Sequence, residues 1–174
     1  MRILDALDIL NTWDKRGHYV FTKGDLAKLF YESAESLVKT LERLTDKGIL
    51  IRAARGVYVF GYSNHLGAYT LEEIAQTLRR NEYNYLSLES ALSEWGVISQ
   101  APIDRITVMT TGRKGEFQTP FGVIEFTHTE NSPDYIRENT IWRKPYPLRI
   151  ANETLALKNQ RRVGRNASLI EENA

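Results

Sequence analysis

Four polar side chains recur on one side of the segment from Ser33 to Gly48, and their types suit contacts with DNA. Lys39 and Arg43 are four residues apart, so on a helix they share one face. Their donor groups can bind guanine edges or backbone phosphates, and the hydroxyl groups of Ser36 and Thr40 lie beside them. The spacing therefore predicts a helix that presents these four side chains to the major groove.

Two further arginines, Arg52 and Arg55, fall in a short segment that predicts a β-hairpin directly after this helix. Its strands are the β-rich runs Ile49–Arg52 and Val57–Phe60, and the turn between them is Ala53–Gly56. Cations on such a hairpin contact phosphates or the minor groove. Helix and hairpin together predict one basic surface for nucleic acid.

The same side chains also fit a plainer interpretation, in which they are solvated charges on an amphipathic helix. Glu35 and Glu42 weaken the positive field of that helix, and modules of this shape also bind proteins. The net charge of the chain is only +1, so any attraction to DNA depends on local clustering. Both interpretations stay open on this argument.

The elements that would position these residues can be predicted from apolar spacing and capping residues. Ser33 is a suitable N-cap for a helix with one buried face, and Thr22 is a suitable N-cap for the helix before it. The apolar stripe of the later helix consists of Ala34, Leu37, Val38, Leu41 and Leu44. With a first helix ending near Trp13 and a short extended piece at Tyr19–Phe21, the order is typical of a winged helix-turn-helix. We predict such a DNA-binding domain over residues 1–62.

Residues 63–174 predict a second, small mixed α/β domain with an antiparallel sheet, so the chain as a whole is expected to be α+β. Helices are predicted to begin at Thr70 and Ser87. The predicted strands are Arg105–Thr111, Glu116–Thr119 and Phe121–His128, with a hairpin turn at Gly112–Gly115 and a tight bend at Pro120.

Composition excludes several classes of protein. The chain has no cysteine, which excludes disulfides, cysteine-based zinc sites and thiol catalysis, and which suits a reducing cytoplasm. The first residues carry acids within an apolar run and do not form a secretory signal. No apolar run approaches the roughly 18 residues of a membrane span. A cytoplasmic protein without membrane contact is expected.

An enzymatic role has weak support in the sequence. His18, His65 and His128 are not spaced as metal ligands, and no phosphate-cradling loop is present. Acids at predicted strand ends resemble parts of a metal-dependent nuclease, although such acids are usually only solvated. They are Asp104, Glu116, Glu125 and Glu130, with His128 beside them. We predict no catalytic residues, no metal and no cofactor.

The final part of the chain interleaves aromatic rings with positive charges, as many nucleic-acid surfaces do. Its candidate partner-binding residues are Arg143, Lys144, Arg149, Lys158, Arg161 and Arg162, followed by Arg165. Such a surface suits a nucleic acid or an acidic protein partner. A core position for Trp142 with solvated arginines around it is the alternative.

Several motifs occur together in one order: KGILIRAARGVYVF at Lys47–Phe60, SLESAL at Ser87–Leu92, ITVMTT at Ile106–Thr111 and TPFGVIEF at Thr119–Phe126. With LRIANETLAL at Leu148–Leu157, this series resembles the AbiEi-type antitoxins of bacterial type IV toxin–antitoxin systems. The resemblance extends from about residue 3 to residue 165. Each motif is short, and the signal comes from their order and spacing.

The resemblance implies an N-terminal winged helix and a C-terminal antitoxin domain. Members of that family repress their own operon at inverted repeats and counter a cognate nucleotidyltransferase toxin, without necessarily forming a stable complex with it. By position, the DNA contacts would come from Ser36, Lys39, Thr40, Arg43, Arg52 and Arg55. This chain is shorter than the long members of the family. The alternative is a winged-helix transcriptional regulator whose second domain senses a ligand or partner and which has no toxin.

Overall fold

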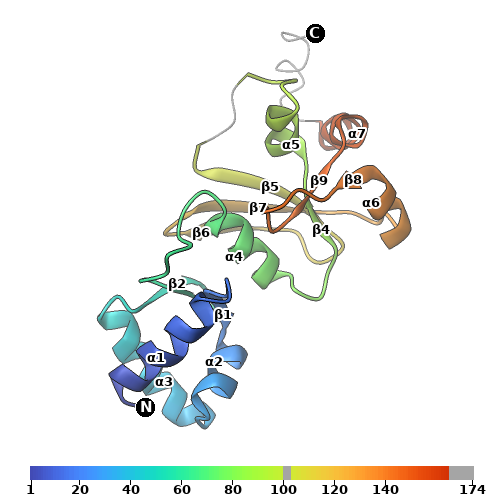
Figure 1. The fold of residues 1–174 in the computed structure, drawn as a ribbon. Helices are drawn as coiled ribbons and strands as arrows, with labels where there is room; N and C mark the ends of the chain where they lie inside the picture. Colours follow the sequence, from blue (N-terminus) through green and yellow to red (C-terminus); the bar gives the residue numbers. More distant parts are fainter. Residues whose placement is uncertain (100–102, 165–174) are drawn as a thin grey trace. The chain divides into compact units, whose positions relative to one another are not determined.

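The computed structural model describes residues 1–99 and 103–164. The chain divides into two compact units, Met1–Thr70 and Leu71–Ala174, which we call unit 1 and unit 2 (Figure 1). Each unit combines helices with a β-sheet, so the protein belongs to the α+β class as the sequence predicts. Among the described residues, no helix has the length and apolar character needed to cross a membrane.

Unit 1 contains three helices and a three-stranded antiparallel sheet. Along the chain these are α1 (Ile3–Asp14), β1 (Val20–Thr22), α2 (Lys23–Phe30), α3 (Ala34–Asp46), β2 (Leu50–Ala54) and β3 (Val57–Phe60). In the sheet β3 lies between β1 and β2, and Val59 pairs with Val20 on one side and Ile51 on the other. The hairpin β2–β3 therefore follows α3 directly, where the sequence predicts it.

Local capping explains why α2 and α3 begin where they do. Thr22 Oγ1 accepts a hydrogen bond from the backbone N–H of Asp25, and the Asp25 carboxylate accepts one from the backbone N–H of Thr22. Ser33 Oγ accepts from the backbone N–H of Ser36 at 3.3 Å. These bonds satisfy N–H groups that the first turn of a helix leaves without partners. Both predicted N-caps are confirmed.

The core of unit 1 is formed by apolar side chains of all three helices and of the hairpin. It includes Ala6, Leu10, Leu26, Leu37, Leu44, Leu50 and Val59. The predicted apolar stripe of α3 is wrong at two positions, since Ala34 is exposed and Val38 is 40% exposed. Both positions lie at the edges of the stripe, where 3.6-residue spacing separates buried from exposed positions poorly.

The segment after the hairpin is bound to α1. Asp14 is 3% exposed, and its carboxylate accepts hydrogen bonds from the hydroxyl group of Ser63 and from the backbone N–H of Asn64. The ring Nδ1 of His65 lies 3.1 Å from the same carboxylate. A domain boundary after residue 62 would cut this network, and in the structure the first unit extends to Thr70. Because these contacts join residues about fifty positions apart, sequence pattern could not reveal them.

Unit 2 is built around a six-stranded sheet. Its helices are α4 (Thr70–Leu78), α5 (Leu88–Glu94), α6 (Pro133–Asn139) and α7 (Glu153–Val163). Its strands are β4 (Asn84–Leu86), β5 (Arg105–Thr110), β6 (Gly115–Thr119), β7 (Gly122–His128), β8 (Thr140–Ile141) and β9 (Arg149–Ala151). The strand order is β6-β7-β5-β4-β9-β8.

This sheet is mixed, so the predicted antiparallel sheet is wrong. β5 runs parallel to β7, and β4 runs parallel to β9, while the other neighbouring pairs are antiparallel. The predicted hairpin at Gly112–Gly115 is also wrong, because β7 lies between the two strands that this turn connects. The true hairpin is β6–β7, which turns at Pro120–Phe121.

Helices cover both faces of the sheet in unit 2, with α5 and α7 on one face and α4 on the other (Figure 1). On the α4 side the buried residues include Ile74 of the helix and Val108 of β5. On the other side Asn159 of α7 donates to the hydroxyl group of Ser87 at 2.8 Å. The centre of the sheet is therefore closed to solvent on both faces.

Candidate nucleic-acid interface

The outer face of α3 carries three of the predicted DNA-contact residues. Ser36, Lys39 and Arg43 are all exposed. Nη2 of Arg43 donates to the carbonyl oxygen of Met1 at 2.7 Å, which fixes the guanidinium group beside the start of α1. No such tie holds Lys39 in the described part of the chain. The helix thus presents one anchored cation, Arg43, and one exposed cation without such a bond, Lys39, on the same side.

Thr40 is a correction to the predicted DNA contacts. Its side chain is only 2% exposed, and its hydroxyl group donates to Oε1 of Glu32 at 3.0 Å. The side chain of Ser36 is a further hydrogen-bond partner of Glu32. Burial alone would raise the pKa of Glu32, but the hydrogen bonds from the Met1 ammonium group and Thr40 outweigh burial and lower that pKa. Thr40 therefore supports the helix from inside and is closed to outside partners.

A groove of about 550 Å³ runs between α3 and the hairpin, which we call the α3–hairpin groove. Arg52 and Arg55 line it from the hairpin, and both side chains are exposed. Gly56 completes the turn with φ +74°, a backbone conformation that favours glycine. The other lining residues are Lys23, Val38, Leu41, Glu42, Thr45, Asp46 and Tyr58. Helix and hairpin thus present their side chains to one shared space.

The charges in the α3–hairpin groove are mixed. Lys23, Arg52 and Arg55 supply positive charge, while Glu42 and Asp46 of α3 supply negative charge. Phosphate oxygens are attracted to the cationic side, and carboxylates accept hydrogen bonds from the cytosine amino group. The arrangement favours recognition by a pattern of donors and acceptors over binding by charge alone.

Sequence reasoning missed Lys23 and Tyr58 as residues of this groove. A signal for Tyr58 was available, because Val57 and Val59 are buried in β3 and alternation sends the residue between them to the other face. Lys23 directly follows the N-cap Thr22, and only the fold brings it to the hairpin. No local pattern predicts that proximity.

Two arginines of the predicted partner surface in unit 2 serve the fold instead. Nε of Arg149 donates to Thr140 Oγ1 at 2.7 Å, and Nη2 donates to the carbonyl oxygen of Thr140 at 2.9 Å. Nη1 of Arg143 donates to Glu94 at 3.1 Å, and its guanidinium carbon lies 4.0 Å above the ring of Tyr146. These contacts hold both guanidinium groups within unit 2, so neither arginine is a freely solvated surface charge.

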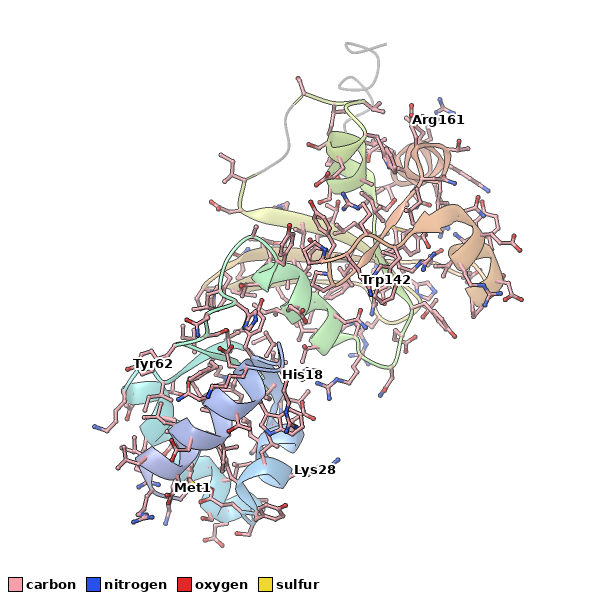
Figure 2. All side chains as sticks on the ribbon, viewed as in Figure 1. Met1, His18, Lys28, Tyr62, Trp142 and Arg161 are labelled. Carbon is pink, nitrogen blue, oxygen red and sulfur yellow. The ribbon has the colours of Figure 1, made fainter. Side chains whose placement is uncertain are left out.

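The remaining basic residues of the predicted partner surface are exposed, and so is Trp142. Lys144 and the α7 residues Lys158, Arg161 and Arg162 are exposed. Trp142 is 59% exposed, so a core position for it is wrong. Figure 2 shows Trp142 and Arg161 at separate places in unit 2. Arg165 lies outside the described residues.

Two of the acids that suggested a nuclease, Glu116 and Glu125, are held by one arginine. Nη1 of Arg105 lies 3.0 Å from a carboxylate oxygen of Glu116 and 2.9 Å from one of Glu125. His128 is oriented by its contact with the carbonyl oxygen of Gly112 at 2.7 Å. Across residues 1–99 and 103–164, no group of three or more histidine or acidic side chains is placed to hold a metal ion.

Burial strongly changes the pKa of Glu72 on α4. This residue is 6% exposed, and burial raises its pKa to about 7, although the Leu148 backbone N–H and the nearby Arg143 act in the opposite direction. In the described part of the chain, Oε1 of Glu72 and both Nε and Nη2 of Arg143 are buried without a hydrogen-bond partner. This carboxyl group is therefore sensitive to pH near neutrality.

Comparison with known protein families identifies the family of this chain. A family model matches residues 7–139, from α1 to the end of α6. The chain belongs to the DUF6088 family, a family of unknown function. The matched region of this DUF6088 protein includes α3, the hairpin and all strands up to β7, whereas β8, β9 and α7 lie beyond it. A comparison with curated proteins gives no match.

Among solved structures, the chain is similar to the crystal structure of RV2827C protein from Mycobacterium tuberculosis. The TM-score is 0.50 and the sequence identity is 16%, over 75% of this chain and 47% of the other. The chain thus spans about half the length of that structure. At this identity the likeness is one of fold.

Proposed function

We propose that unit 1 is a winged helix-turn-helix and that the protein is a sequence-specific DNA-binding regulator. The observation that carries the proposal is the α3–hairpin groove, where Arg52 and Arg55 lie across from α3. Lys39 and Arg43 are exposed on the same helix, outside the lining of that groove. The order α1, β1, α2, α3, β2, β3 supports it, because in such folds the third helix enters the major groove and the hairpin lies beside it.

Side-chain chemistry assigns different DNA contacts to α3 and to the hairpin. Lys39 and Arg43 would donate to base edges or phosphates from within the major groove. Arg52 and Arg55 would bind phosphates of the adjacent backbone or reach the minor groove. Thr40 and Glu32 would hold α3 in position and make no contact with DNA. Specificity would come from α3, and most of the salt-dependent affinity from the hairpin.

We further propose that the protein is an antitoxin that represses its own operon and counters a cognate nucleotidyltransferase toxin. The support is the ordered set of motifs resembling AbiEi-type antitoxins, of which ITVMTT lies on β5 and TPFGVIEF on the β6–β7 hairpin. Unit 2 would carry the antitoxin activity. A chain that starts at Leu71 should then still relieve growth arrest when co-expressed with the toxin. Persisting arrest would count against this division of functions.

A transcriptional regulator without a toxin is the competing proposal. It is favoured by the buried, unpartnered polar atoms of Glu72 and Arg143, which would suit a second unit that senses a ligand. The identity of the neighbouring gene separates the two, because only the antitoxin proposal requires a nucleotidyltransferase there.

DNA binding itself can be tested by fluorescence anisotropy with the fragment upstream of the gene. The full chain should bind this fragment at least about a thousandfold more tightly than an unrelated duplex of equal length, which is the lower end of the usual range for specific binders. Equal affinity for the two duplexes would overturn sequence-specific regulation.

A further inference from the structure

A second groove in unit 1 lies between α1 and α2, away from the α3–hairpin groove, and we call it the α1–α2 groove. It has a volume of about 590 Å³. Its apolar lining includes Ile9 and Trp13 of α1 and Leu29 of α2. The other lining residues are Met1, Asp8, Thr12, Lys28 and Tyr31. None of these side chains belongs to the proposed DNA-contact set.

Tyr31 stands at one end of this groove in a conformation that is costly for its residue type. It caps α2 with φ +52° and ψ +39°, in the left-handed region, where a side chain costs roughly 1 kcal/mol relative to glycine. Its side chain is 95% exposed, and its phenol makes no hydrogen bond within the described part of the chain. The fold of unit 1 therefore gains little from the ring, which indicates a contact outside the chain.

The charges of the α1–α2 groove come in both signs. Asp8 on α1 and Lys28 on α2 are exposed, and Lys28 points away from its helix (Figure 2). In the described part of the chain neither side chain forms an ion pair. Each is therefore available to a partner of opposite charge.

We propose that this groove is a two-fold interface with a second copy of the chain, in which Asp8 pairs with Lys28 of the partner subunit. A two-fold interface uses the same patch on both copies, so the patch must complement itself. An apolar lining with one acid on one wall and one base on the other meets that condition. A strongly acidic partner would attract Lys28 and repel Asp8, and a strongly basic partner would do the reverse.

Tyr31 has a defined role in this arrangement. An exposed tyrosine supplies a large, rigid contact area with little loss of side-chain freedom, which is typical of residues that dominate interfaces. Its ring would pack against the apolar lining of the second copy. The backbone cost at this position is then offset in the dimer and not in the isolated chain.

The test is the molar mass of the full chain without DNA, measured by size-exclusion chromatography with light scattering. Wild type should be a dimer, while Asp8→Lys and Lys28→Glu should each be monomeric at the same concentration. The double variant D8K/K28E should be a dimer again, since the two reversals restore opposite charges across the interface. A monomeric wild type, unaffected single variants or a monomeric double variant would each overturn the proposal.

A further variant separates interface from fold. Tyr31→Gly removes the ring and suits the positive φ, so it should lose the dimer while unfolding at a higher temperature than the monomeric Asp8→Lys variant. A variant that remains dimeric would show that the ring makes no intersubunit contact and would overturn its assigned role. Because no DNA is present, these results do not depend on the proposed regulatory function.

Discussion

Thr40 donates a hydrogen bond to Oε1 of Glu32 at 3.0 Å and thereby ties the middle of α3 to the turn before it. The same carboxylate oxygen accepts from the Met1 ammonium group at 2.8 Å. Arg43 completes the arrangement by donating to the carbonyl oxygen of Met1. A partly buried polar cluster therefore holds α3 at the side that carries Arg43, and the exposed Lys39 remains outside it.

Replacing Thr40 by valine should lower stability without changing DNA affinity. The free energy of unfolding should fall by about 1 kcal/mol, because the hydrogen bond to Glu32 is removed together with the longer one that Thr40 Oγ1 accepts from Arg43 at 3.5 Å. Lys39→Ala is the matched control variant. It should leave the free energy of unfolding unchanged and weaken DNA binding. Urea denaturation and anisotropy titrations on both variants measure the two quantities. A large loss of DNA affinity in the valine variant would contradict the internal role of Thr40.

Removing both hairpin cations should weaken binding to all DNA sequences alike. Arg52→Ala combined with Arg55→Ala should reduce the slope of log affinity against log salt concentration by about one for each phosphate that the variant no longer neutralises. The control is Arg113→Ala with Lys114→Ala, which removes two exposed cations from a loop of unit 2. An unchanged salt slope in the hairpin variant would place these arginines away from DNA.

Asp14 should stabilise unit 1 above acidic pH. Burial alone would raise the pKa of Asp14, but the hydrogen bonds from Ser63 and His65 outweigh burial and lower that pKa. The stabilisation is therefore present above the usual pKa of 3.8 and is lost as pH falls through the lower pKa of the folded state. Asp14→Ala should cost about 2 kcal/mol at neutral pH.

The control for Asp14 is Asn64→Ala, which keeps the backbone N–H that donates to the carboxylate. Its free energy of unfolding should stay close to that of wild type. Equal effects of the two substitutions in urea denaturation would show that the carboxylate does not hold the segment after the hairpin.

Glu72 should make unit 2 less stable as pH rises. A carboxyl group with a folded pKa of about 7 binds its proton more tightly in the folded state than in the unfolded state, where the pKa is near 4.5. Its contribution is fully present below about pH 4.5 and is lost as pH rises to about 7. The difference in the free energy of unfolding is on the order of 3 kcal/mol.

Glu72→Gln removes this dependence on pH, so the variant should be more stable than wild type at about pH 8. Parallel curves for both proteins between about pH 5 and pH 8 would refute the shift.

The sequence predicts best where structure is decided locally. Thr22 and Ser33 cap α2 and α3 through bonds to residues three positions ahead, and Asn152 caps α7 in the same way. Such bonds depend on residue type and spacing alone, and both can be read from the chain.

The sequence predicts structure poorly where contacts between distant segments determine it. β4 has three residues, all buried, so the alternation that marks a strand is absent. The turn at Gly112–Gly115 has the composition of a hairpin, yet its strands are separated by β7, which pairs in parallel with β5. Among the candidate site residues, Thr40 and Arg149 bond to Glu32 and Thr140, partners that no local pattern connects to them.

The central claim is that α3 reads DNA, and charge reversal on its outer face tests it most directly. Lys39→Glu with Arg43→Glu should abolish retardation of the upstream promoter fragment in a gel shift, whereas Arg113→Glu with Lys114→Glu, an equal change of charge in unit 2, should leave it intact. Circular dichroism should show both variants folded. Unchanged retardation by the α3 variant would contradict the proposal that this helix enters the major groove.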